Sequence, residues 1–215
     1  MRPDAKPMKV ALYAVAIMLL LVTCPATSDR ERVFPVGHVV INEILYNLSA
    51  GRDLEEWIEL YNNSEHIVNL RGWALDDRDT HRFTFPDNLS VAPGDYVLVA
   101  TNAEHLSLMT TQPDYAVVAY QTASGRPLNL QIWNNDGDEI VLTDASGQIV
   151  DYVAFGNPDA PGRDPHPPQA AWQGNIPTPP PGYALTLFPD GYDMDSSANW
   201  SFRPPEQISP GKRNE

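Results

Sequence analysis

Short apolar runs, in which apolar and polar side chains tend to alternate, fill this chain from residue 39 onward, and Asn, Asp, Gly and Pro separate them. Successive side chains of a β-strand point to opposite faces, so the pattern predicts strands, and the 3.6-residue period of an amphipathic helix is almost absent. The 21 prolines and 13 glycines among 215 residues also disfavour a helical bundle, because proline lacks an amide donor and glycine weakens helices. We therefore expect a turn-rich antiparallel β protein.

Nine stretches have the alternation or the apolar density of a strand. They are residues 39–46, 56–61, 67–70, 73–76, 81–85, 96–101, 115–120, 139–144 and 148–155. Residues 183–188 add a further strand signal, and residues 103–109 are expected to form one or two helical turns. The spacing fits a β-sandwich, in which two sheets cover each other's apolar faces.

Glycine marks two of the expected turns. Gly147 lies between two alternating runs and predicts a β-hairpin, because glycine takes the positive φ that such a turn requires. Pro93 and Gly94 suit a turn before residues 96–100, which are nearly all apolar. A run of that kind is expected as a central strand covered on both faces.

The N-terminal segment has the layout of a secretory signal. Arg2, Lys6 and Lys9 precede an uninterrupted apolar stretch at residues 10–22. As a helix this stretch would be about 20 Å long, which is short of the roughly 30 Å core of a bilayer. We expect residues 1–28 to be a signal peptide and the mature chain to be secreted or at the cell surface, with a retained membrane anchor as the alternative.

The single cysteine, Cys24, lies inside this segment. Residues 21–24 resemble a bacterial lipobox, in which the cysteine becomes the lipidated N-terminus, although Thr23 stands where that motif has Gly, Ala or Ser. Cys24 is therefore a candidate lipidation site, which would make the protein lipid-anchored. If cleavage follows Ser28 instead, the mature chain has no cysteine and hence no disulfide.

The charge balance is strongly acidic. Fourteen Lys and Arg stand against 28 Asp and Glu, which gives a net charge of −14. Removing residues 1–28 takes away three basic residues and one acidic residue, so the mature chain would carry 11 against 27 and a net charge of −16. Such a surface repels nucleic acid and anionic lipid. Contact with a membrane is expected only through the N-terminal segment.

Three stretches in order resemble the lamin-tail domain. They are residues 40–46 with 56–62, residues 68–76 with 83–86 and 93–100, and residues 133–142 with the hairpin that follows. That family is an immunoglobulin-like β-sandwich found in nuclear lamins and in exported bacterial proteins. The resemblance implies such a sandwich at residues 36–155 and association with other macromolecules.

Residues 156–215 are expected to form a C-terminal extension. Nine of the 21 prolines fall between residues 156 and 182, which predicts an extended wrap over the surface. A short strand and an acidic tail follow, and residues 203–215 are expected to fray. The tail also resembles bacterial members of the family at Asp193-Met194-Asp195, Asn199-Trp200 and Ser209-Pro210-Gly211.

Catalytic signatures are missing from the sequence. It contains no Gly-x-Ser-x-Gly elbow, no His-Glu-x-x-His and no phosphate-binding glycine loop, and its five histidines are scattered. Glu43, Glu56 and Glu59 could act as an acid and a base, but a structural role or a solvated strand edge is the preferred interpretation. We therefore expect a protein that is not an enzyme.

Tryptophans and acidic turns supply the candidate binding residues. Trp57 and Trp73 are expected in the core. Asp193, Asp195, Ser197 and Asn199 alternate oxygen ligands as a calcium loop would, although the EF-hand pattern fails because Ala198 and Pro204 occupy its glycine and glutamate positions. We expect either no cofactor or a calcium ion at these four residues. Residues 134–139 form a second, weaker cluster of the same kind.

Two functions remain open. The first is a non-catalytic extracellular or cell-surface module that tethers an unknown protein or glycan. The alternative is an accessory carbohydrate-binding module, or a component of an extracellular hydrolase system, in which Trp133, Trp172 and Trp200 would stack on sugars. Binding of nucleic acid would require basic residues such as Arg71, Arg78 and Arg82 to cluster.

Overall fold

The computed structural model describes residues 39–48, 56–77, 82–87, 89–101, 133–157 and 172–214, together with the backbone of 116–119. The leader with Cys24, the expected helical turns at residues 103–109, Arg78, and residues 158–171 of the Pro-rich wrap lie outside these described residues. Among the described residues, no helix combines the length and the apolar character needed to cross a membrane.

Six strands form the larger sheet, in the order β12-β11-β1-β2-β7-β8. Their bounds are β1 Val39–Leu45, β2 Trp57–Asn62, β7 Tyr96–Ala100, β8 Ala116–Ala119, β11 Ala184–Leu187 and β12 Trp200–Arg203. All neighbours pair antiparallel except β7 and β8, which are parallel. The C-terminal extension therefore supplies two strands of this sheet, because β11 pairs with β1 and β12 pairs with β11.

Four strands form the second sheet, in the order β10-β9-β4-β5. Their bounds are β4 Ala74–Asp76, β5 Arg82–Thr84, β9 Gly137–Thr143 and β10 Ile149–Gly156. The expected hairpin joins β9 to β10, and Gly147 has a φ of +83° in its turn. Two short strands, β3 (Val68–Asn69) and β6 (Ser90–Val91), pair with each other, and short 3₁₀ turns form η2 (Ser197–Asn199) and η3 (Pro205–Gln207).

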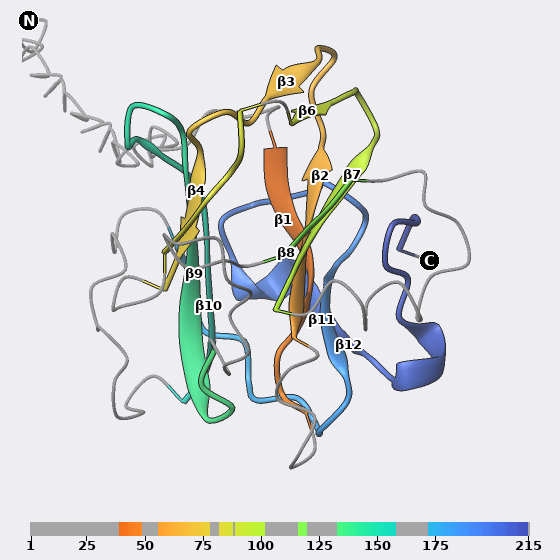
Figure 1. Ribbon diagram of the computed structural model, residues 1–215. Helices are drawn as coiled ribbons and strands as arrows, with labels where there is room; N and C mark the ends of the chain where they lie inside the picture. The colour runs from red at the N-terminus through yellow and green to blue at the C-terminus, as the bar shows by residue number, and fades with distance from the viewer. Residues whose placement is uncertain are drawn as a thin grey trace, which may run out of the picture. The chain divides into compact units, whose positions relative to one another are not determined.

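The main core lies between the two sheets, which form separate layers in Figure 1. It includes Ile44, Ile58, Leu60, Val97 and Val99 from the larger sheet and Leu75, Ile140, Leu142, Val153 and Phe155 from the second. This confirms the expected immunoglobulin-like β-sandwich, because the alternating runs bury one apolar face of each sheet against the other.

A second, smaller apolar cluster covers the outer face of the larger sheet. It contains Leu45, Leu48, Trp57, Leu98, Ala100 and Ala184, and Ile208 packs against it. On β2, Trp57 therefore faces outward while Ile58 and Leu60 face the main core. The prediction that residues 96–100 are covered on both faces is confirmed in the same way, since Val97 and Val99 belong to one cluster and Leu98 to the other.

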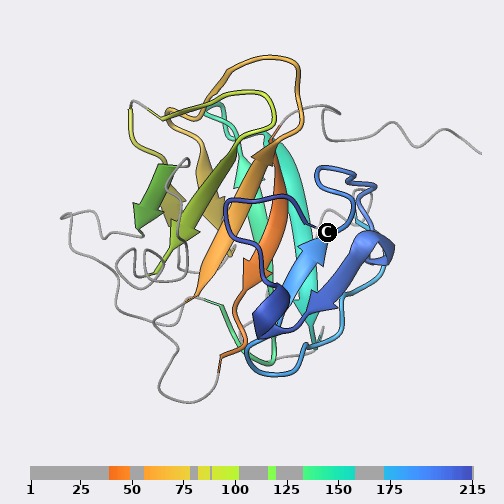
Figure 2. The ribbon, with the colours of Figure 1, turned by 90° about the vertical axis from the view of Figure 1, so that its right-hand side faces the viewer.

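The chain after β12 lies across this outer face, as Figure 2 shows. We call residues 204–214 the C-terminal strap. Its central turn runs from Ser209 to Lys212, where the Lys212 amide donates to the Ser209 carbonyl at 2.9 Å and Gly211 has a φ of +71°. The expectation that residues 203–215 fray is wrong for the described residues, because backbone amides of the strap bond to buried carboxylates of the sheet.

Candidate functional site

Three carboxylates from distant parts of the chain lie close together. Asp151 lies on β10, whereas Asp193 and Asp195 lie between β11 and η2. One oxygen from each lies within 4.8 Å of the others. Asp151 is buried, and the other two are partly exposed. The group joins the second sheet to the C-terminal extension.

Backbone contacts fix the positions of these carboxylates. Asp151 accepts amide hydrogen bonds from Ile41 and Tyr152, both at 2.6 Å, and the bond from Ile41 links β10 to β1. The Asp193 side chain accepts the Asp195 amide at 2.8 Å, and Asp195 has a φ of +51°, which Asp tolerates better than most residues. The Asp195 carbonyl in turn accepts the Gln173 amide at 2.8 Å.

The surroundings of Asp151 disfavour its negative charge. Burial raises the pKa of this carboxyl well above its usual range, and repulsion from Asp193, with less from Asp195, raises it further. The hydrogen bonds from Ile41 and Tyr152 act in the opposite direction. A cluster of this kind is stabilised either by a proton or by a bound cation.

The structure brings together two of the four calcium ligands expected from the sequence. Asp193 and Asp195 are in the group, and Asp151 joins them from another strand. Ser197 and Asn199 lie on η2, where the Ser197 hydroxyl lies beside Gly174 and the Asn199 carbonyl accepts the Phe188 amide at 3.0 Å. Sequence reasoning missed Asp151, although an acidic residue inside the apolar run of β10 was a signal.

A second acidic constellation lies beneath the C-terminal strap. Glu43 on β1 lies directly opposite Glu59 on β2, and both are completely buried. A β-bulge between Ile41 and Glu43 sets this register and brings Asn42 to the same place, where its side-chain amide donates to Glu59 at 2.9 Å. The two acids are therefore interior groups of the fold.

The strap supplies hydrogen-bond donors to both acids. The Ser209 amide donates to Glu43 at 3.3 Å, and the Gly211 amide donates to Glu59 at 2.6 Å. The Asn214 amide donates to Asp190, which extends the network to the loop after β11. These bonds show the structural role that was preferred for Glu43 and Glu59, and their burial rules out a solvated strand edge.

Burial also shifts the pKa values of Glu43 and Glu59. Burial raises the pKa of Glu43 to about 7, while the hydrogen bond from Ser209 opposes the rise. Burial raises the pKa of Glu59 well above its usual range, and repulsion from Glu43 adds to the effect. Both shifts favour the protonated form of these buried acids.

Glu56, the third carboxylate singled out in the sequence, is also completely buried. One of its oxygens accepts the Trp133 amide at 3.3 Å. Glu56 therefore fastens the chain at Trp133 to the start of β2 and is not a solvated charge.

Most of the tryptophans belong to the interior. Trp57 is completely buried and Trp73 packs against the main core, as expected. Trp133 and Trp172 are only 1% and 7% exposed, so the expectation that their rings stack on sugars is wrong. Trp200 on β12 is partly exposed and packs against the core at the sheet edge. Of the three candidate sugar platforms, Trp200 alone reaches the surface.

Comparison with known proteins identifies the sandwich. The family model of the lamin tail domain matches residues 33–157. Among solved structures, a DUF4876 family protein from Bacteroides thetaiotaomicron VPI-5482 is similar, with a TM-score of 0.54, 14% identity, and coverage of 78% of this chain and 71% of that one. An identity this low shows likeness of fold alone. The search of curated proteins found no match.

Proposed function

The chain belongs to the lamin tail domain family, and from this membership we propose that it is a non-catalytic binding module that tethers a protein or glycan outside the cell or at its surface. The location rests on the leader at residues 1–28, with lipidation of Cys24 as the route to an anchored form. The family supports an interaction role, and the chain itself must supply the residues that carry it.

One observation supports the non-catalytic part of the proposal most directly. The carboxylates best suited to acid and base chemistry, Glu43 and Glu59, are completely buried and receive amide hydrogen bonds from the strap. A general acid or base must reach the proton that it transfers. These two groups reach only other parts of the fold, so their chemistry serves the structure.

The test of location and binding uses the full chain expressed in its own host. We expect added protease to digest the protein on intact cells, or the protein to appear in the medium. We also expect purified, fluorescently labelled protein to be retained saturably on washed cell envelopes and displaced by unlabelled protein. Protein confined to the cytoplasm, retention that does not saturate, or breakdown of envelope polymers by the purified protein would contradict the proposal.

An accessory carbohydrate-binding role has less support. It was motivated by three tryptophans, and two of them are core residues. Trp200 alone offers part of its ring at the sheet edge. A single partly covered indole gives a small stacking surface.

We further propose that Asp151, Asp193 and Asp195 bind a calcium ion. Calcium takes six to eight oxygen ligands in flexible geometry, so three converging carboxylates can supply part of its shell while carbonyls and water supply the rest. The ion would neutralise mutual repulsion at the buried Asp151. It would also fasten the C-terminal extension to β10. In a chain with one cysteine, and hence no internal disulfide, such an ion would supply a cross-link between distant segments.

Calcium is expected to raise the melting temperature by about 4 °C at ten times its dissociation constant, because binding to the folded state then contributes about 1.4 kcal/mol. Asp193→Asn is expected to abolish this shift, and Asp95→Asn, at an exposed turn, is the matched control. The measurement is thermal unfolding in CaCl2, in MgCl2 and in EDTA at equal ionic strength. An equal shift with magnesium, or an unchanged shift in Asp193→Asn, would refute the site.

A further inference from the structure

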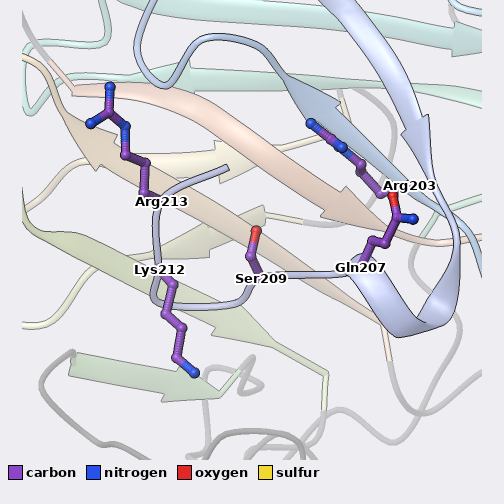
Figure 3. A pocket seen from close by; sticks show the side chains of 5 residues that line it. All are labelled: Arg203, Gln207, Ser209, Lys212 and Arg213. Carbon is purple, nitrogen blue, oxygen red and sulfur yellow. The ribbon is translucent and has the colours of Figure 1, made fainter. Parts of the chain in front are cut away.

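The C-terminal strap forms one wall of a cavity of about 400 Å³. Its lining residues are Arg203, Gln207, Ser209, Lys212 and Arg213, which Figure 3 shows from close by. Three of these five residues are cations, whereas the whole chain has 14 Lys and Arg among 215 residues and a net charge of −14. The cavity is therefore a concentration of positive charge on an acidic protein.

The cations are held by a fixed backbone. The strap is anchored to the sheet through the amides of Ser209 and Gly211, and through Asn214, which is only 3% exposed. Side chains that extend from an ordered backbone lose less conformational entropy when a ligand binds than those of a free tail. The ordered strap therefore lowers the entropy cost of binding a ligand through Lys212 and Arg213.

The positive charges are largely available to a ligand. Within the described part of the chain, the ion pairs join Arg71 to Asp87 and Arg82 to Asp76, and neither includes a residue of the cavity. The Arg203 guanidinium lies over the Phe188 ring, 5.7 Å from its centroid. It also interacts electrostatically with the buried Glu43. The guanidinium keeps its donors, because contact with a ring face leaves them unused.

The arrangement of the side chains indicates which of them meet a ligand. In Figure 3, Arg203 and Gln207 lie on one side of Ser209, and Lys212 and Arg213 lie on the other. The guanidinium groups of Arg203 and Arg213 extend to the same side of the strap, whereas the Lys212 amine extends to the opposite side. All three cations line the cavity, so the two arginines meet a ligand from one side and Lys212 meets it from the other.

We propose that this cavity binds a small polar ligand through an anionic oxygen group, namely a phosphate, a sulfate or a carboxylate. The planar guanidinium presents paired N–H donors that match such groups, and Gln207 and Ser209 offer further polar contacts. The volume is that of a small-molecule site and exceeds the needs of a bare ion, so the anion belongs to a larger polar ligand such as a sugar acid or a sugar phosphate. The charge of the whole chain repels long polyanions. This inference rests on the proposed binding role and names the ligand class for it.

The test is a titration of the full chain with glucose 6-phosphate, glucose 6-sulfate and glucuronate, with glucose as the neutral control. Binding is followed by amide NMR shifts of the strap and by calorimetry. We expect saturable one-site binding of at least one anion and none of glucose. The three anions separate the possible sources, since the group that binds most tightly identifies the natural ligand as a phosphate, a sulfate or a carboxylate.

Arg213→Gln is expected to weaken this binding about tenfold, which is the effect of losing one hydrogen-bonded charge. Arg71→Gln is the matched control, because it removes the same charge from an exposed residue outside the cavity, and it is expected to leave the binding unchanged. Arg203→Gln gives a second, independent loss. Equal melting temperatures of Arg213→Gln and the unmodified chain establish that folding is intact.

Three outcomes would overturn the inference: no saturable binding of any anion, equal binding of glucose, or equal losses in Arg213→Gln and Arg71→Gln. The titration is independent of the proposed location and of envelope retention. If anions fail to bind while envelopes retain the protein, the ligand class is wrong and the tethering proposal survives. If anions bind while the protein stays in the cytoplasm, the ligand class is right and the tethering proposal is wrong.

Discussion

Replacing Asn214 by alanine is expected to lower the free energy of unfolding by about 3 kcal/mol. The side chain is buried near the end of the chain, where its amide donates to the carbonyls of Leu187 at 3.0 Å and Asn42 at 3.4 Å. Its oxygen accepts the Ser209 hydroxyl at 2.8 Å. Alanine would remove all three bonds and leave their partners unsatisfied beneath the strap. The measurement is urea unfolding followed by tryptophan fluorescence.

Arg213→Ala is the control for this experiment. Arg213 precedes Asn214 but is exposed, so its truncation is expected to change the free energy of unfolding by less than about 0.5 kcal/mol. If both variants have the same stability as the unmodified chain, the strap is not anchored in solution. A lower denaturant slope in Asn214→Ala would indicate that the strap has detached while the sandwich remains folded.

The sheets could be predicted from the sequence because their signal is local. Each of the nine predicted stretches overlaps a strand, and residues 183–188 contain β11. On β2, strand geometry puts Trp57 and Ile58 on opposite faces, and in the structure the two side chains pack in different clusters. Two strands were not predicted, β6 and β12, since two and four residues are too few for a clear period.

The strap could not be predicted because its stability comes from distant partners. Ser209 bonds to Glu43, 166 residues away, and Gly211 bonds to Glu59, 152 residues away. The segment is polar and contains prolines, which is also the composition of a frayed end. The Ser209-Pro210-Gly211 motif was noted only as a likeness to bacterial members of the family, and what lies beneath it depends on the assembled sheet. The cavity beside it was hidden for the same reason.

The acidic triad was predictable in part. Asp193 and Asp195 attracted attention because oxygen ligands alternate there along the chain. Asp151 comes from a strand 42 residues earlier, and only the pairing of the sheets brings it near. Trp133 and Trp172 were misread because an indole in a loop looks the same in sequence whether it covers the core or faces solvent. Burial there depends on packing between elements, which no local pattern encodes.

Lowering the pH from 8 to 5 is expected to stabilise the fold, by about 2.5 kcal/mol from Glu43 alone. Burial raises the pKa of this carboxyl from 4.5 to about 7, with Asp190 raising it further and Ser209, Thr186 and Arg203 opposing the rise. Between these two values the folded chain binds a proton that the unfolded chain has lost. The stabilisation is therefore complete below pH 4.5 and disappears as the pH rises through 7.

Glu43→Gln tests this assignment, because glutamine resembles the protonated acid in shape and keeps an oxygen for the Ser209 amide. We expect the variant to be more stable than the unmodified chain by about 3 kcal/mol at pH 8 and by about 1 kcal/mol at pH 5, and equal to it below pH 4.5. Glu65→Gln, on an exposed turn, is expected to leave the pH dependence unchanged.

The measurement is urea unfolding from pH 5 to pH 8 in EDTA, which keeps the acidic triad free of metal. Glu43→Gln should retain some pH dependence, because burial also raises the pKa of Asp138 to about 7. A fold that becomes more stable as the pH rises would mean that the amides of the strap hold Glu43 as an anion. In that case Glu43→Gln would be less stable than the unmodified chain at pH 8. The sign of this difference in the free energy of unfolding therefore distinguishes a protonated Glu43 beneath the strap from an ionised one.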